Sequence, residues 1–362
     1  MISISQEEVI KVLQQIRHPE KGKDIISLDL VKGLAIGEKE ISFTLYPSKV
    51  GDPLLSSIKK ACIQALAGQF GKDISVEIDI AQPDNKVAAE GKKVLTGVKN
   101  IIVIASGKGG VGKSTVAANL AVAVAATGAK VGLIDADIFG PSIPKMLNVE
   151  FDQPMVKNVD GKDMIVPVEH YGVKVLSIGF FVDEKQPVIW RGPMASGALK
   201  QLIEQGDWGD LDYLFIDTPP GTSDIHITLV QEIQVTGAVI VSTPQKVALA
   251  DAIKGLNMFT NEKINVPVLG LVENMSWFTP KELPGNKYFI FGKEGCKELA
   301  RSMNVPLLGQ IPIVQGICEG GDLGIPSVLD GNSMDGKAFI ELAKNLIEQV
   351  KLRKSVEETT KS

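Results

Sequence analysis

Cysteine and histidine are scarce in this sequence of 362 residues. The three cysteines, Cys62, Cys296 and Cys318, are odd in number and widely spaced, which disfavours a disulfide framework and predicts free thiols. The three histidines stand far apart along the chain, which argues against a histidine-based metal cluster.

The sequence also lacks a long apolar run and a surplus of positive charge. No run approaches the roughly 18 residues that a membrane span requires, and no basic region followed by an apolar stretch occurs at the N-terminus. The net charge of -5 gives no general attraction for phosphate backbones. We therefore expect a cytoplasmic protein that binds neither nucleic acid nor a membrane.

The composition that is present indicates a globular chain of two domains. Hydrophobic residues make up 44% of the sequence, and its length exceeds the roughly 250 to 300 residues at which a single core stops growing. The predicted organisation is a small α+β domain over 1–80, a polar linker over 81–97, a larger domain over 98–353 and a flexible tail over 354–362.

Apolar spacing predicts the elements of both domains. In the first, helices are expected at 5–16 and 55–66 and strands at 24–31, 38–46 and 74–80. In the second, helical stretches separate most of the strand-like Val/Ile/Leu runs, and a last helix is expected at 335–353. These runs lie at 101–105, 130–137, 173–180, 212–220, 238–244, 266–274 and 305–312. This alternation predicts an α/β fold with a mostly parallel, doubly wound sheet.

The stretch IIVIASGKGGVGKSTVAANLAVAVAATG, residues 101–128, fits two phosphate-binding patterns. The dinucleotide fingerprint G-x-G-x-x-G is matched by Gly107, Gly109 and Gly112, and Asp135 stands about where a ribose-binding acid falls. The P-loop pattern G-x-x-x-x-G-K-[ST] is matched by Gly107, Gly112, Lys113 and Ser114. The second match arises by chance far less often, and a dinucleotide site needs neither that lysine nor that serine. We therefore interpret the stretch as a P-loop.

A P-loop also needs an acid at the end of another strand, to hold the magnesium shell. The segment LDYLFIDTPPGTSD supplies Asp217 directly after an apolar run, followed by a Thr-Pro-Pro-Gly turn. Asp217 alone is equally well explained as a helix cap at a strand end, but the P-loop favours the magnesium role. His226 follows this turn; an ordinary core or surface role is expected for it, and sensing of the nucleotide state is the alternative that its place near the site leaves open.

A second lysine, Lys108, follows the first glycine of GKGGVGKST, as in the deviant Walker A ATPases, and the wider sequence resembles the Mrp/ApbC-type iron–sulfur cluster carriers within that class. The matching segments are DADIFGPSIP (135–144), WRGPMASGALKQL (190–202), DTPPGTSD (217–224), STPQKVALAD (242–251) and ENMSWF (273–278). The resemblance spans about residues 98–350, and residues 1–80 resemble the small iron–sulfur-assembly-type domain often fused ahead of it in bacterial members.

The resemblance implies a homodimeric ATPase whose slow hydrolysis gates the assembly of iron–sulfur clusters or their transfer to apoproteins. ATP is implied to bind at Gly107, Lys108, Gly109, Gly110, Val111, Gly112, Lys113, Ser114, Thr115 and Asn274, with Asn274 at the adenine. Mg²⁺ is implied at Ser114 and, through water, at Asp217. The implied catalytic residues are Lys108, Lys113, Asp137 and Asp217, with Lys108 reaching into the partner's site and Asp137 positioning the attacking water.

The sequence departs from the family at the cluster site. Many members carry C-x-x-C shortly after the ENMS element, whereas this chain reads FTPKELPGNKYFIFG there. Cys296, at the start of a predicted helix, and Cys318, on a predicted loop, belong to no ligand-spaced pair and are more simply structural thiols. They remain the candidate cluster ligands, while Cys62 is expected in the core of the small domain.

Two alternative functions stay open at this point. One is an ATP-gated scaffold or partitioning-type ATPase that binds partner proteins without carrying a cluster. The other is a small-molecule kinase or ligase on a P-loop scaffold, for which no substrate acid or base is identifiable. The mixed charges of the C-terminal helix and the net charge of -5 argue against membrane-binding and DNA-binding versions of the first.

Overall fold

The computed structural model divides into two compact units, Met1–Glu90 and Gly91–Ser362, which are described separately. The residues that the structure describes are 5–19, 22–28, 30–37, 40–46, 55–71, 74–80, 95–138, 140–159, 161–181, 192–222, 224–261, 264–280, 282–283 and 285–361. Most of the predicted linker, residues 81–94, lies outside this set. Each unit has its own hydrophobic core.

The first unit is a small α+β domain, as predicted. Its helices are α1 (Gln6–Leu13) and α2 (Leu55–Phe70), and its sheet has the order β1 (Val31–Ile36), β2 (Glu40–Leu45), β3 (Ser75–Ile80). Strand β2 pairs antiparallel with β1 and parallel with β3. Leu13, Phe43, Cys62 and Leu66 are buried in the core between the helices and the sheet, so Cys62 takes the expected core position.

The first predicted strand, at 24–31, is wrong. Residues 24–28 form a turn, in which the Asp24 carboxylate accepts hydrogen bonds from the N–H groups of Ile26 (3.1 Å) and Ser27 (2.7 Å). The strand begins only at Val31. An aspartate that bonds its own following backbone competes with strand pairing, and apolar spacing does not register this effect.

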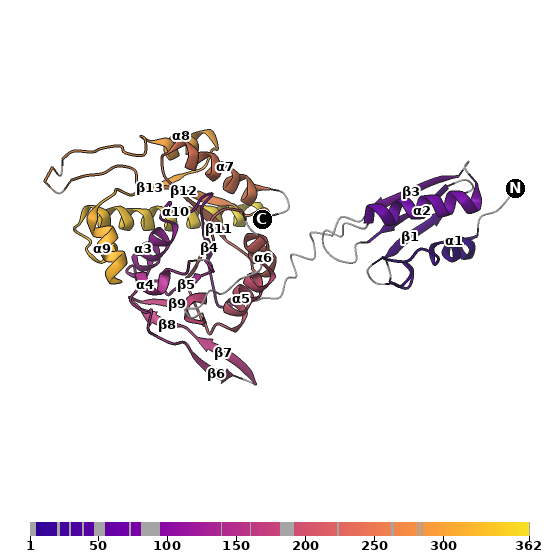
Figure 1. Ribbon diagram of the computed structural model, residues 1–362, viewed down its shortest axis with the longest axis horizontal. Helices are drawn as coiled ribbons and strands as arrows, with labels where there is room; N and C mark the ends of the chain where they lie inside the picture. Colours follow the sequence, from indigo (N-terminus) through magenta and orange to yellow (C-terminus); the bar gives the residue numbers. More distant parts are fainter. Residues whose placement is uncertain are drawn as a thin grey trace. The chain divides into compact units, whose positions relative to one another are not determined.

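The second unit is built on an eight-stranded, mostly parallel sheet (Figure 1). Across the sheet the order is β13 (Leu307–Gln310), β12 (Val268–Glu273), β11 (Gly237–Ser242), β4 (Ile101–Ala105), β10 (Tyr213–Asp217), β5 (Val131–Asp135), β9 (Val173–Ser177), β8 (Val168–His170). Only the edge strand β8 runs antiparallel to its neighbour. A separate ribbon of β6 (Met155–Val159) and β7 (Lys162–Val166) projects from the unit, and no strand was predicted there.

Helices cover both faces of the sheet. Their bounds are α3 (Lys113–Ala125), α4 (Ile143–Met146), α5 (Gly192–Gln205), α6 (Asp224–Glu232), α7 (Lys246–Thr260), α8 (Gly295–Ser302), α9 (Gln315–Leu323) and α10 (Met334–Lys361), with 3₁₀ turns at Ile178–Phe181 and Ser327–Leu329. One core contains side chains of α3 and α10, and the other contains side chains of α5, α6, α7 and α8. Ile102 and Ile104 of β4 face the first core while Ile101 and Val103 face the second, so the α/β doubly wound prediction is confirmed.

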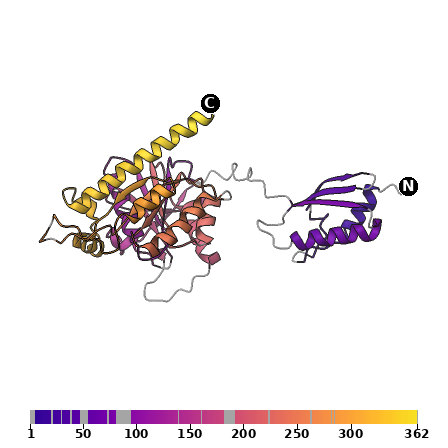
Figure 2. The same ribbon diagram turned by 90° about the horizontal axis from the view of Figure 1, so that it is seen from above.

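The two ends of the second unit differ from the predicted limits. Gly97 already belongs to it, because its carbonyl accepts a hydrogen bond from the N–H of Leu211 (2.9 Å). At the other end α10 continues to Lys361, so the tail predicted from residue 354 is helical (Figure 2). Lys354 donates to the carbonyl of Lys99 (3.3 Å). Extending an existing helix by one turn costs much less free energy than nucleating a new helix. The prediction, which relied on apolar spacing, did not include this effect.

In the part of the chain that the structure describes, every helix is too short or too polar to cross a membrane.

Candidate functional site

The glycine-rich loop lies between β4 and α3, at the carboxyl end of the parallel strands. Gly110 and Gly112 both have φ +79°, a left-handed conformation that suits glycine. A Cβ at Gly107 would collide with the backbone of Asp251, so the loop is packed closely against α7. No side chain caps the N-terminus of α3 at Gly112, which leaves the first amides of the helix available to an anion.

Lys113 is the first residue of α3 and lies at the centre of the site. It is 6% exposed, and its ammonium is 2.6 Å from Asp217 Oδ1 and 3.7 Å from Asp137 Oδ2. The same ammonium donates to the Ser114 hydroxyl at 3.2 Å. The fold therefore brings together four predicted residues from three separate segments, Lys113 and Ser114, Asp137, and Asp217.

Two carboxylates lie on neighbouring strands beneath the loop, with Asp135 at the end of β5 directly in register with Asp217 at the end of β10. Both are fully buried. Burial raises the pKa of Asp217, which Lys113 partly offsets, and burial together with the nearby Asp217 charge raises the pKa of Asp135 to about 7. Asp217 Oδ2 has no hydrogen-bond partner among the described residues.

Asp135 is held as a structural support. Its carboxylate accepts hydrogen bonds from the N–H groups of Asp137 (3.2 Å) and Ile143 (3.2 Å) and from the hydroxyl of Ser177 (3.0 Å). These bonds fix the loop that carries Asp137 beside Lys113. Sequence reasoning missed Ser177, whose only signal is its position directly after the apolar run of β9.

Asn274, at the end of β12, contacts the P-loop itself. Its side-chain amide donates to the carbonyl of Val111 at 2.8 Å, and a Cβ at Gly112 would collide with that amide nitrogen. The neighbouring Glu273 is fully buried and accepts hydrogen bonds from the N–H of Cys296 and from the side chain of Gln310, both at 2.7 Å. Glu273 thus anchors α8 and β13 beside the site, a role that sequence reasoning missed.

The remaining predicted residues lie at the edge of the site. Lys108 and Gly109 are exposed, and the Lys108 carbonyl accepts a hydrogen bond from the hydroxyl of Ser106 (3.0 Å). Thr115 is half-buried within the first turn of α3. An exposed lysine on this loop is in a position to meet another molecule, whereas Lys113 is not.

The cysteines predicted as candidate ligands differ in accessibility. Cys296 is fully buried at the start of α8, and burial followed by the charge of Glu273 raises the pKa of its thiol to about 12. Cys318 is exposed and lies in helix α9, so its predicted loop position is wrong. The three glycines of α9 give this segment a low helix propensity, so the sequence suggested a loop. Packing of α9 against α4 stabilises the helix despite them.

The residues of the site fit a Mg²⁺–polyphosphate. Mg²⁺ prefers oxygen ligands and keeps several waters, and the lone Asp217 Oδ2 is a suitable acceptor for one such water. The Ser114 hydroxyl, the Lys113 ammonium and the uncapped first amides of α3 lie beside Asp217 and suit phosphate oxygens. Within the described ranges no cluster of three or more His, Cys, Asp or Glu side chains forms a site built wholly from protein ligands.

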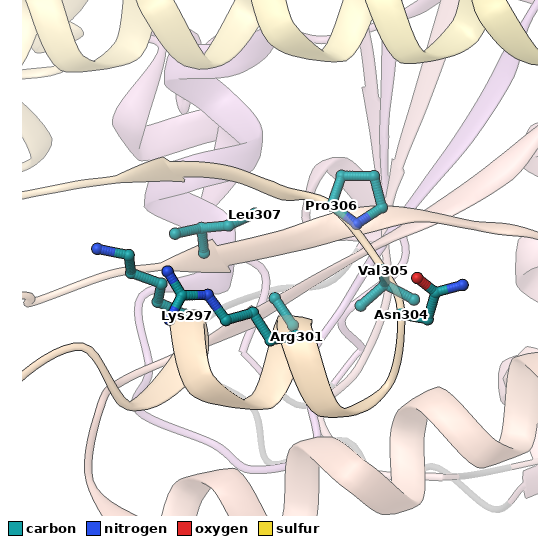
Figure 3. A pocket seen from close by; sticks show the side chains of 7 residues that line it. Lys297, Arg301, Asn304, Val305, Pro306 and Leu307 are labelled. Carbon is teal, nitrogen blue, oxygen red and sulfur yellow. The ribbon is translucent and has the colours of Figure 1, made fainter.

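A pocket of about 480 Å³ lies elsewhere, between α8 and the start of β13 (Figure 3). It is lined by Lys297 and Arg301 of the helix, by Ala300, and by Asn304, Val305, Pro306 and Leu307 of the following segment. Lys297 is already paired with Glu294 at 2.9 Å. No P-loop residue lines this pocket, so it is separate from the candidate site.

The parallel sheet, the P-loop and the buried lysine–carboxylate cluster define a P-loop nucleotide-binding protein. The profile of the family described as NUBPL iron-transfer P-loop NTPase matches residues 97–347, and that of the family described as iron-sulfur cluster assembly protein matches residues 6–78. The chain therefore belongs to the Mrp/ApbC-type iron–sulfur cluster carrier family of P-loop NTPases and carries the N-terminal assembly-type domain, as the sequence resemblance predicted.

Individual relatives agree with this assignment. The chain is 43% identical over 351 residues to the iron-sulfur cluster carrier protein of Synechocystis, covering 96% of this chain and 99% of the relative. A nucleotide-binding protein from Archaeoglobus fulgidus, solved with ADP, is 37% identical with a TM-score of 0.58, covering 70% of this chain and 96% of its own. The cell division ATPase MinD of Pyrococcus furiosus is 28% identical with a TM-score of 0.51, covering 69% and 98%.

Proposed function

We propose that this chain is an ATP-hydrolysing, homodimeric iron–sulfur cluster carrier that assembles clusters or transfers them to apoproteins in the cytoplasm. The observation that carries the ATPase part is the buried contact of Lys113 with Asp217 beside Ser114 and Asp137. The carrier part rests on the family and on the match to the Synechocystis carrier along nearly the whole chain.

ATP is the substrate of the P-loop in this proposal. The amides from Gly107 to Thr115 surround its phosphates, and Lys113 binds the β- and γ-phosphates. Ser114 would ligate Mg²⁺ and Asp217 would hold it through water. The metal supplies charge neutralisation at the phosphates.

Two charged residues complete the proposed hydrolysis site. Asp137, 3.7 Å from the Lys113 ammonium, orients the attacking water. Lys108, exposed on the loop, enters the site of a second copy and neutralises charge on the phosphoryl group there. Asn274 contacts the adenine from its position against the carbonyl of Val111.

Cys318 is the better candidate cluster ligand of the two proposed. Metal ligation needs a thiolate that iron can reach; the thiol of Cys318 is exposed on α9, whereas Cys296 is buried and burial raises the pKa of its thiol to about 12. One Cys318 from each protomer, together with ligands from outside the chain, would bridge a cluster.

Anaerobic reconstitution with iron and sulfide tests the carrier, read out by visible absorption and iron content per dimer. We expect a cluster in the wild type and in Cys296→Ser and Cys62→Ser, and its loss in Cys318→Ser. Phosphate release should fall at least about a hundredfold in Lys113→Ala, because the charge that positions the γ-phosphate is removed.

The absence of C-x-x-C favours a second candidate, an ATP-gated scaffold that binds partner proteins without carrying a cluster. The similarity to a protein described as a cell division ATPase from Pyrococcus furiosus supports this second candidate. A wild type that takes up no cluster but retains Lys113-dependent ATPase activity would establish this candidate and refute the carrier.

A further inference from the structure

The turn that follows Asp217 is bonded to the strand and loop that lead into the P-loop. Both the N–H (3.1 Å) and the hydroxyl (3.0 Å) of Thr218 donate to the carbonyl of Ile104 in β4. Three residues later the N–H of Gly221 donates to the carbonyl of Ser106 at 2.8 Å. If this turn moves, either these hydrogen bonds break or the residues that lead into the phosphate loop move with it.

His226, in the first turn of α6, contacts the same threonine. It has no exposed surface, and its Nε2 is 3.0 Å from Thr218 Oγ1. The Thr218 hydroxyl is placed to donate to the Ile104 carbonyl, and while its one hydrogen lies there the hydroxyl accepts from the ring. In that arrangement Nε2 carries a proton, and a buried chain of hydrogen bonds runs from His226 through Thr218 to Ile104.

The position of His226 is fixed from the other side as well. Its ring lies edge-on to Phe259 of α7, with the ring centroids 6.0 Å apart. The hydrogen-bond chain is thus held between two packed helices and the P-loop strand. Closely packed groups of this kind transmit a displacement instead of absorbing it.

Helix α6 is in turn joined to α5. The hydroxyl of Thr228 donates to that of Ser196 at 3.2 Å, and the Lys200 ammonium lies 2.9 Å from Glu232. A displacement of α6 reaches α5 through these contacts, on the face of the sheet opposite α3.

We propose that His226 is the positioning residue that couples the nucleotide state at the Asp217–Gly221 turn to helices α6 and α5. It holds Thr218 and so sets the turn for hydrolysis, and it passes a change in the turn to the two helices. This proposal rests on the ATP binding proposed above. A merely structural core histidine would affect stability alone.

Three variants test the proposal. His226→Leu removes the donor, His226→Gln retains an N–H donor on a side chain of similar reach, and Leu229→Val shortens another fully buried side chain of the same helix. We expect kcat for ATP to fall roughly ten- to a hundredfold in His226→Leu, with dissociation constants for ATP and ADP changed less than about twofold. His226→Gln should restore most of kcat, and Leu229→Val should match the wild type.

Amide hydrogen exchange measures the coupling directly. Protection of α5 and α6 should differ between the ATP-analogue and ADP states of the wild type and of His226→Gln, and this difference should vanish in His226→Leu. An unchanged kcat or a retained exchange difference in His226→Leu refutes the coupling, as does equal loss in Leu229→Val or a glutamine variant that rescues nothing.

A measurement on the wild type covers the case in which His226→Leu fails to fold. With only three histidines in the chain, long-range nitrogen–proton spectra can assign the tautomer of each ring. A proton on Nε2 of His226 supports the chain to Thr218, and its absence overturns it. A wild type that binds no ATP would refute the proposed function itself, whereas ATP binding with a fully active His226→Leu would refute only the coupling.

Discussion

At the scale of single residues, burial separates the thiols of the chain by reactivity. The pKa values of Cys62 and Cys296 are raised to about 12, chiefly by burial, whereas Cys318 is exposed. At pH 8 only about one in ten thousand of the buried thiols is ionised, and the thiolate is the species that reacts.

We therefore predict that iodoacetamide labels Cys318 alone in the folded chain at pH 8 and all three cysteines in denaturant. Peptide mass spectrometry after brief exposure reads out the labelled sites. Because both raised pKa values lie far above the assay range, any labelling of Cys296 should increase about tenfold per pH unit from 7 to 9. Equal labelling rates for Cys296 and Cys318 at pH 8 would contradict the burial argument.

Much of the candidate site was predictable residue by residue. Lys113, Ser114 and Asp217 were placed by motif spacing and strand ends, and the structure brings them within contact. The bond from Asn274 to the Val111 carbonyl was not predictable, because the two residues are far apart in sequence and no pattern encodes which backbone group an amide meets. The same holds for Ser177 and its bond to Asp135.

At the scale of elements, the phosphate loop offers a matched pair of glycines. Gly110 and Gly112 share φ +79°, so alanine strains the backbone equally at both, but only at Gly112 does the new Cβ meet the Asn274 amide. We expect both substitutions to cost about 1 kcal/mol for the backbone, and Gly112→Ala a further roughly 1 to 3 kcal/mol for the overlap. Chemical denaturation without nucleotide measures the difference, and equal losses would show that the loop yields at Asn274.

The long helix α10 stabilises the sheet through one side only. Leu346 is fully buried against α3, while Leu352 is 52% exposed. Leu346→Ala should lower the unfolding free energy by about 2 to 5 kcal/mol, and Leu352→Ala should change it by less than about 0.5 kcal/mol. Urea titrations of the two variants compare them; similar losses would mean that the end of the helix is packed in solution.

Element prediction failed where local polar bonds or tertiary contacts outweighed the apolar pattern. Asp24 formed a turn where a strand was expected, and α9 formed a helix despite its glycines. The β6–β7 ribbon has a fully exposed strand at 155–159, so it lacks the buried face that produces alternation. The buried strands of the main sheet, by contrast, were found because they are continuously apolar.

At the scale of the whole molecule, the core of the first unit is separate from the two cores of the second, which predicts two independent folding units. A fragment of residues 91–362 should bind ATP within about twofold of the full chain, and residues 1–90 should unfold cooperatively on their own. Calorimetry and nucleotide titration of both fragments provide the measurement. In the small fragment Leu66→Ala should cost about 2 to 5 kcal/mol, because Leu66 is fully buried. A fragment 1–90 without a cooperative transition would contradict its independence.

The proposed exchange of Lys108 between protomers predicts complementation. Lys108→Ala and Lys113→Ala should each be inactive alone, yet their mixture should recover roughly a quarter of wild-type ATPase activity, because each mixed dimer retains one complete site. The matched control is Lys113→Ala alone, at the total protein concentration of the mixture. No recovery, with mixed dimers shown by mass, would place the action of Lys108 within its own subunit.

The contact between Lys113 and Asp217 has a consequence for how the site fills. Lys113, the cation suited to phosphate, is already paired with Asp217, the carboxylate suited to the metal, and both side chains are buried. In the proposed function both partners of this contact would be exchanged when Mg²⁺–nucleotide binds: Lys113 would turn from Asp217 to a phosphate oxygen, and Asp217 would turn from Lys113 to a water of the metal's shell. Each buried charge would then keep a partner of opposite sign throughout. Nucleotide without metal, or metal without nucleotide, would leave one buried charge unpaired and should therefore bind poorly.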